Sequence, residues 1–193
     1  MDAVPHASGL TNRDYMNYVI NDARRNNPNI KIAVTLLWGS RNTISKIFSI
    51  SKQSPNEAAE QFAANLMAYL KHYDLDGFDI DWEYPISSFT TKEQFRLLIN
   101  AIGAQFKNQT DKHYYLTLSA AEVGNLDANA VNNNIDFINL QLYSGFTDPD
   151  EFENVGINPK LFAYGAEFES HYQTAAKAYQ DNKNNYNYTI FTS

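Results

Sequence analysis

The stretch from Asp76 to Pro85 constrains the fold of this chain most, because acidic residues alternate in it with bulky apolar ones. Successive side chains of a β-strand point to opposite faces, so a strand here places three acids on one face and three large apolar side chains on the other. The acids are Asp79, Asp81 and Glu83, and the apolar residues are Phe78, Ile80 and Trp82. Alternation alone fits either a solvated acidic face of an antiparallel sheet or an inward row of acids in a covered parallel sheet.

Helical patterns on both sides of the stretch favour the parallel sheet. Before it, Ser54-Pro-Asn-Glu57 is typical of a helix start, with a capping residue, a proline and a glutamate three residues on. After it, Thr90-Thr-Lys-Glu93 predicts a second capped helix. One face of the first predicted helix carries Ala58, Phe62, Leu66, Tyr69 and Leu70, and one face of the second carries Phe95, Leu98, Ile99, Ile102 and Phe106. Strands alternating with helices indicate βαβ units, whose strands are covered on both sides.

Three acids on one covered face cannot all ionise freely. Residues two apart on a strand lie about 6.6 Å apart, and two charges at that distance repel by roughly 2.5 kcal/mol at an effective dielectric constant of about 20. At least one carboxyl group is therefore expected to hold or share a proton near neutral pH. A protonated acid beside a charged neighbour is the combination that a hydrolase needs. The alternative is a buried hydrogen-bond network without chemistry.

The rest of the chain continues the alternation of helices and strands. A helix is predicted over about residues 12–27, a loop or short helix around the polar run 129–134, and another helix from Ser170. The strand from Asp136 to Tyr143 places Asn139, Gln141 and Tyr143 on one face, toward the acids. The other predicted strands are Ile30 to Trp38, Tyr114 to Ala121 with Glu122 at its mouth, Leu161 to Ala166, and Tyr188 to Phe191.

Composition narrows the class of protein. The 193 residues, 44% hydrophobic, suffice for one domain, residues 1–193, or a segment of one. No apolar run is long enough to span a membrane, and residues 1–9 show no signal peptide. A net charge of -7 without a basic cluster argues against nucleic acid as a partner. None of the histidines has acids at metal-ligand spacing, so we expect no metal. No phosphate-binding loop is present, so we expect no cofactor. The histidines are His6, His72, His113 and His171.

Asp76-x-x-Asp79-x-Asp81-x-Glu83, followed by Tyr84 and Pro85, resembles the DxxDxDxE motif of glycoside hydrolase family 18, the chitinases and endo-β-N-acetylglucosaminidases. The resemblance implies an α/β fold, a (β/α)8 TIM barrel, with this motif at the carboxyl end of strand four. The chain then supplies only strands three to eight, and such barrels usually run to about 250 residues. An unclosed sheet exposes two edges, so we expect the remaining strands to come from the rest of a longer chain or from another chain.

The resemblance also implies roles for single residues. Glu83 would be the general acid, Asp81 would orient the substrate's acetamido group, and Asp79 would share a proton with Asp81. Gln141-Leu-Tyr143 matches the family's sixth strand, where the tyrosine would bind the attacking carbonyl oxygen. Gln141, Tyr84 and Trp38 are candidate sugar contacts, although Trp38 fits a packing role as well. Asp76, which precedes the row, is expected to be structural.

The function implied is cleavage of β-1,4-linked N-acetylglucosamine polymers, chitin or chitooligosaccharides, by a secreted enzyme using substrate-assisted retaining catalysis. Two alternatives remain open at this stage. One is an endo-β-N-acetylglucosaminidase acting on N-glycans, for which Gln141 and the atypical third strand leave room. The other is a chitinase-like protein that binds glycans without turning them over, although the presence of Glu83 favours activity.

Overall fold

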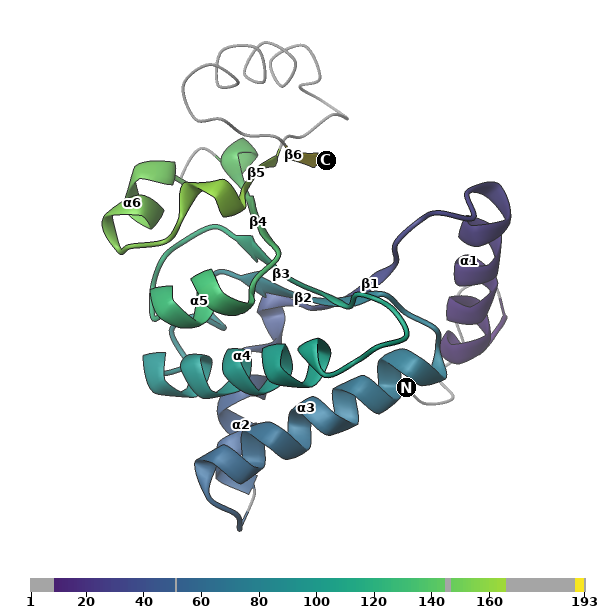
Figure 1. Cartoon of the computed structure of the whole chain (residues 1–193), viewed down its shortest axis with the longest axis horizontal. Helices are drawn as coiled ribbons and strands as arrows, with labels where there is room; N and C mark the ends of the chain where they lie inside the picture. Colours follow the sequence, from purple (N-terminus) through teal and green to yellow (C-terminus); the bar gives the residue numbers. More distant parts are fainter. Residues whose placement is uncertain (1–8, 51, 145–146, 166–189, 193) are drawn as a thin grey trace.

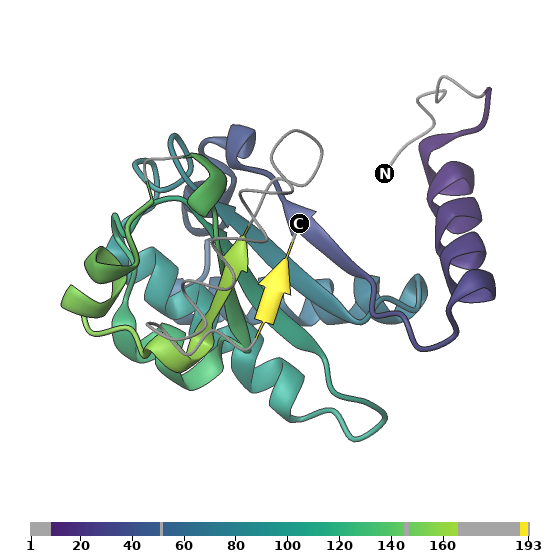
Figure 2. The same cartoon turned by 90° about the horizontal axis from the view of Figure 1, so that it is seen from above.

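A parallel sheet of six strands, paired in chain order, forms the framework of the molecule (Figures 1 and 2). The computed structural model describes residues 9–50, 52–144, 147–165 and 190–192. Within them every pair of neighbouring strands is parallel, which is the arrangement of successive strands in a (β/α)8 barrel. The strands are β1 (Ala33–Leu36), β2 (Gly77–Trp82), β3 (Tyr115–Ala120), β4 (Phe137–Leu140), β5 (Phe162–Gly165) and β6 (Ile190–Thr192).

Helices connect the strands and cover one face of the sheet, where α3, α4 and α5 lie side by side in Figure 1. α1 stands apart, beyond the β1 edge. The helices are α1 (Asn12–Asn26), α2 (Thr43–Ile50), α3 (Pro55–His72), α4 (Lys92–Lys107), α5 (Ala128–Asn134) and α6 (Pro149–Asn154), and short 3-10 helices cover Trp38–Ser40, Leu142–Ser144 and Pro159–Leu161. No helix in the described part of the chain is long and apolar enough to cross a membrane.

The two predicted helix starts are present, one of them shifted by a residue. Ser54 caps α3 through the amide of Glu57, and the Glu57 carboxylate returns a bond to the Ser54 amide, as the sequence predicted. The cap of α4 is Thr91 with Gln94, one residue later than predicted. The Thr90 hydroxyl instead donates to the carbonyl oxygen of Ile86, 2.8 Å away in the protein interior. Thr91 therefore caps the helix in place of Thr90, and Gln94 stands three residues after it, as a capping box requires.

The hydrophobic core lies between the sheet and the helices. Phe78, Ile80 and Trp82 are buried on the helix side of β2, as predicted, and Trp82 packs edge-on against Phe95 of α4. Every residue predicted for the inner face of α4 is buried. On α3, Phe62 and Tyr69 pack against the core as the predicted face requires, but they are only partly buried. The buried side chains of α3 are Ala58, Ala59, Ala63, Leu66, Met67 and Leu70.

Two strands are shorter than their apolar runs predicted. In the run from Ile30 to Trp38 only the four residues of β1 form a strand. Among the described residues no strand pairs with the outer edge of β1, and its side chains are half-exposed or exposed. The predicted strand Asp136 to Tyr143 ends at Leu140, and the chain turns into a 3-10 helix over Leu142–Ser144. Hydrophobic periodicity does not mark such ends, since Leu37 and Trp38 continue the apolar run after β1 and Leu142 continues the alternation after β4.

Several elements had no counterpart in the predictions or cannot be compared with them. Neither α2 nor α6 was predicted, and they are only 8 and 6 residues long. Some features of the sequence analysis lie outside the described residues. They are the helix predicted from Ser170, the end of the predicted strand at Ala166, the predicted strand start at Tyr188, and the histidines His6 and His171.

Candidate active site

The three predicted acids come together at the carboxyl end of β2, on the face of the sheet opposite the helices. Asp79 and Asp81 belong to β2, and Glu83 is the first residue after it. Parallel register places Thr117 of β3 beside Asp79 and Ser119 beside Asp81. Asp79 is only 8% exposed, whereas Asp81 and Glu83 are half-buried. The row therefore runs from the interior of the sheet toward its open end, where barrel enzymes carry their active sites.

Asp79 is the buried member of the row, and two hydroxyl groups of β3 satisfy it. Thr117 Oγ1 lies 2.7 Å from Asp79 Oδ1, and Ser119 Oγ lies 3.1 Å from Asp79 Oδ2. Burial raises the pKa of Asp79 above its usual value, and the charge of Asp81 adds to this, although hydrogen bonds from Thr117, Ser119 and Thr35 oppose it. Folding therefore favours the protonated form of Asp79.

Gln141 holds the outer two acids. Its Nε2 donates to Asp81 Oδ1 at 2.9 Å and reaches Glu83 Oε1 at 3.5 Å. The amide of Trp38 lies 3.3 Å from Asp81 Oδ2. Gln141 is 7% exposed, so its amide group is fixed against the carboxylates. Sequence reasoning placed Gln141 on the right face but named it as a sugar contact, and its contact with the acids follows from the neighbouring positions of three parallel strands.

The surroundings of Glu83 favour its protonated form over its ionised form. Burial raises the pKa of Glu83, and a hydrogen bond with Asp81 and the charges of Asp81 and Glu122 raise it further, while the Gln141 bond acts in the opposite direction. None of the ion pairs among the described residues includes Asp79, Asp81 or Glu83. A protonated acid beside an ionisable neighbour can protonate a leaving group and can then act as a base.

Three aromatic candidates lie exposed near the same end. Tyr84, Tyr143 and Trp38 are 64%, 52% and 47% exposed, respectively. Trp38 is thus exposed among the described residues, and its proposed contact with a sugar stays a prediction. The predicted extension of a strand through Tyr143 is wrong, because Tyr143 lies in the 3-10 helix after β4. Its proposed contact with the substrate therefore depends on that turn and not on strand alternation.

Sequence reasoning overlooked further groups at this end. Thr117 and Ser119 bind Asp79, and register with β2 could have revealed them, since they alternate on the inward face of β3. Phe89, 45% exposed, follows β2, and the guanidinium carbon of Arg41 lies 4.8 Å from the centre of its ring. This pair carries no simple sequence signal, because the two residues are 48 positions apart (89 minus 41).

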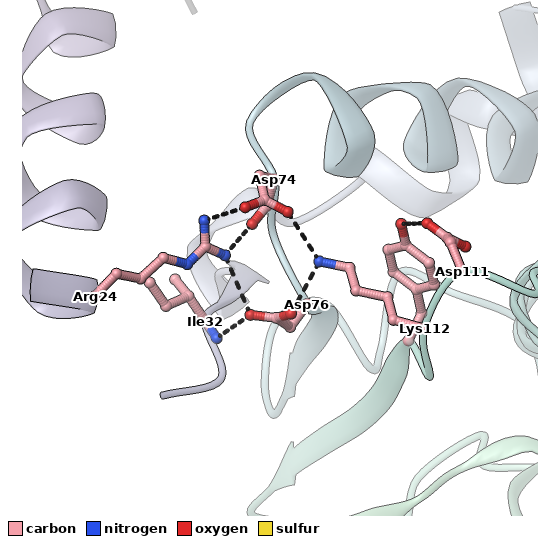
Figure 3. Close-up of polar contacts among 7 residues, drawn as sticks. Arg24, Ile32, Asp74, Asp76, Asp111 and Lys112 are labelled. Atoms are coloured by element: carbon pink, nitrogen blue, oxygen red, sulfur yellow. Dashed lines mark hydrogen bonds and ion pairs between the residues drawn. The ribbon is translucent and has the colours of Figure 1, made fainter. Parts of the chain in front are cut away.

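Asp76, the first acid of the motif, lies at the opposite end of the strands and has the structural position that the sequence predicted (Figure 3). Its carboxylate accepts from Lys112 Nζ at 2.9 Å, from the Ile32 amide at 3.0 Å and from Arg24 at 3.4 Å. Burial alone would raise the pKa of Asp76, but the Lys112 and Ile32 hydrogen bonds and the charges of Lys112 and Arg24 bring it below its usual value. Asp74 contacts the same two cations.

A metal centre finds no support in the described residues, which contain no group of three or more metal-binding side chains. His72 and His113, the two histidines among the described residues, contact side chains other than the three acids. His113 Nε2 is 2.7 Å from Asp136 Oδ1, and His72 contacts the ring of Tyr73.

Comparison with known proteins identifies the family. Residues 5–190 match the family model described as glycosyl hydrolases family 18. The chain belongs to glycosyl hydrolase family 18. Among curated relatives, the endochitinase of Brugia malayi is 31% identical over 130 residues, which cover 62% of this chain and 24% of the relative. Chitinase A1 of Niallia circulans is 26% identical over 140 residues, covering 64% of this chain and 19% of the relative. The aligned part of this chain thus spans a quarter or less of the length of these two relatives.

Solved structures of family 18 proteins share the fold, which confirms the barrel class. Human YKL-39, a pseudo-chitinase with retained chitooligosaccharide binding, superposes with a TM-score of 0.63 at 16% identity, over 82% of this chain and 53% of YKL-39. The class V chitinase of Nicotiana tobaccum gives 0.63 at 18% identity, over 80% and 53%. A chitinase from Bacteroides thetaiotaomicron gives 0.56 at 20% identity, over 86% and 57%. The six parallel strands are therefore part of a (β/α)8 barrel.

Proposed function

We propose that this family 18 chain is the catalytic barrel, or a segment of one, of a chitinase that hydrolyses β-1,4-linked N-acetylglucosamine polymers. The observation that carries the proposal is the contact of Gln141 with both Asp81 and Glu83, which joins two carboxyl groups at the open end of the barrel strands. Because one of them has a raised pKa, the pair can supply both a proton and a negative charge. Curated relatives named chitinases support the choice of substrate.

In the proposed reaction the substrate provides its own nucleophile. The carbonyl oxygen of the substrate's 2-acetamido group attacks the anomeric carbon, and the bond from that carbon to the glycosidic oxygen breaks. Glu83 gives its proton to this oxygen, so that the leaving sugar departs as an alcohol and an oxazolinium ion remains. Asp81 orients the acetamido group and stabilises its positive charge. Asp79 takes part by sharing a proton with Asp81. Glu83, now a carboxylate, then removes a proton from water. The water attacks the anomeric carbon and opens the oxazolinium ring, so that the configuration is retained.

The remaining contacts complete the proposal. Tyr143 binds the attacking carbonyl oxygen, and the exposed rings of Trp38 and Tyr84 stack on sugar faces. Gln141 keeps Asp81 and Glu83 together and reaches the sugar from the same side. Since chitin is too large to enter a cell, a chitin-degrading enzyme of this class is proposed to be secreted.

A second candidate is a glycan-binding protein without turnover, which the likeness in fold to the pseudo-chitinase YKL-39 favours. The two candidates share a binding cleft and differ in whether an acid completes the reaction. Glu83 is present at the end of β2, in contact with Gln141, and this favours the enzyme.

The test uses Glu83→Gln, which preserves size and hydrogen bonding but cannot donate an acidic proton. With a fluorogenic N-acetylchitooligosaccharide, we expect the variant to lose at least about a hundredfold in kcat, the usual contribution of general acid catalysis. Its circular dichroism spectrum and its oligosaccharide binding should remain. The matched control is Glu60→Gln on the exposed side of α3, which should turn over at the unaltered rate.

Each other outcome excludes part of the proposal. Equal turnover by Glu83→Gln would remove Glu83 from the mechanism. Binding without hydrolysis by the unaltered protein would favour the glycan-binding candidate. Release from a high-mannose glycopeptide without cleavage of chitin oligomers would instead indicate an endo-β-N-acetylglucosaminidase.

A further inference from the structure

The loop that follows β2 is bound to the end of β3 by side-chain hydrogen bonds. Trp82 Nε1 donates to the Gly124 carbonyl oxygen at 2.9 Å, and Asn125 Nδ2 donates to the Ser87 carbonyl oxygen at 3.0 Å. The Ser87 hydroxyl donates to Glu122 Oε1. These three bonds cross between the same two segments, residues 82–87 and 122–125, so the two loops form one unit.

Glu83 lies inside this unit. Its carbonyl oxygen accepts from the Ser87 amide at 3.1 Å, closing a turn that begins at Glu83 itself. Ser87 is buried, with 1% of its surface exposed. A single buried serine therefore contacts the backbone of Glu83 with its amide and the carboxylate of Glu122 with its hydroxyl. Displacement of Glu122 would release the side-chain bond that fixes this turn.

Glu122 lies near the turn that begins at Glu83, because Ser87 bonds to both residues. The Ala121 amide bonds to the Trp82 carbonyl oxygen at 3.0 Å, which sets the residues after β3 beside those after β2. Among the described residues, the polar groups that act on Glu83 are Asp81 from its own strand, Gln141 from the end of β4 and Glu122 from the end of β3. None of the ion pairs in that part of the chain includes Glu122.

We propose that Glu122 is a positioning residue for Glu83: through Ser87 it fixes the turn that carries the general acid, and its carboxyl group makes that acid harder to ionise. The inference rests on the proposed role of Glu83. Burial and Asp81 remain the larger causes of the raised pKa of Glu83, and Glu122 adds to them. Glu122 thereby extends the pH range in which Glu83 can donate a proton.

The variant that separates charge from position is Glu122→Gln, which retains an oxygen to accept from Ser87. Removing a negative neighbour makes ionisation of Glu83 easier, so Glu83 should titrate at lower pH, as followed by carbon-13 NMR of its carboxyl group. In the pH dependence of kcat/KM, the basic limb should move to lower pH. On that limb we expect activity to fall roughly two- to fivefold, the size typical of partly exposed charge pairs. Glu60→Gln serves as the control and should change neither measurement.

The positional part is tested with Ser87→Ala, which leaves the charge of Glu122 in place and removes the hydroxyl. Here kcat should fall roughly tenfold with little change in KM, because the acid is displaced and the sugar contacts remain. Unaltered kcat in this variant would show that the Ser87–Glu122 bond does not position Glu83. An unchanged titration of Glu83 in Glu122→Gln would overturn the electrostatic part.

The NMR titration needs no turnover, so its outcome is independent of the proposed reaction. An unaltered protein that binds chitooligosaccharides without cleaving them would contradict the proposed function, while a shift of the Glu83 titration in the same protein would still support the coupling of the two carboxyl groups.

Discussion

Asp79 is a single residue whose burial in the site lowers the stability of the fold when its carboxyl group is ionised. It is the most buried acid of the row and has two hydroxyl donors, yet burial still raises its pKa. Folding therefore favours the neutral acid, and the stability that this acid contributes is complete at pH values below its unfolded value of 3.8. That stability is lost as the pH rises through the higher pKa of the folded state. At neutral pH an ionised Asp79 lowers the stability of the fold.

Asp79→Asn should therefore stabilise the protein at neutral pH, by roughly 0.5–2 kcal/mol, a size common for replacements that relieve an active site. The hydroxyls of Thr117 and Ser119 can either donate or accept, so they can bind the amide. Urea denaturation at a series of pH values provides the measurement. The advantage of the variant should disappear as the pH falls toward 3.8. An advantage that does not depend on pH, or one shared by the exposed control Asp150→Asn, would contradict the assignment.

At the scale of elements, Asp76 joins three segments at the end of the strands opposite the site. Arg24 comes from α1, Ile32 precedes β1 and Lys112 precedes β3, and all three reach one carboxylate (Figure 3). The pKa of Asp76 is lowered in the folded state, so its contribution to stability is present above the unfolded value of 3.8 and is lost as the pH falls through the folded value. Asp76 and Asp79, three residues apart, thus give opposite pH dependences.

Asp76→Asn should lower the free energy of unfolding by about 2–4 kcal/mol at neutral pH, because it removes the charge that two partly buried cations share. Asp74→Asn is a close control, since Asp74 contacts the same two cations with a side chain that is 71% exposed. Exposed pairs contribute about 1 kcal/mol or less. Equal losses in the two variants, measured by denaturant unfolding, would show that burial of Asp76 does not matter.

The elements also show what the sequence could reveal and what it could not. β2 and α4 were predictable because period-two and helical patterns are strong there and both are buried along one whole face. The limits of β1 and β4 were not, since Trp38 and Leu142 continue the apolar run after the strands end. The positions of Asp79, Asp81 and Glu83 followed from alternation, whereas Gln141 and Glu122 depend on which strands lie side by side.

At the scale of the whole molecule, the described sheet is open. β1 and β6 each pair with one neighbour among the described strands. On the inner face, a cavity of about 300 Å³ beside Asp76 is lined by Ala33, Tyr115, Thr117 and Phe137. In a closed barrel these inward side chains fill the interior. The acids lie at the other end of the same face.

The central claim is that this end of the barrel hydrolyses chitin oligomers with the substrate's acetamido group as nucleophile. Proton NMR of the first products released from an N-acetylchitooligosaccharide tests it most directly, because it reads the configuration of the new reducing end before mutarotation. We expect the β-anomer first, formed by retention. Initial release of the α-anomer, or oligosaccharide binding with no product, would contradict it.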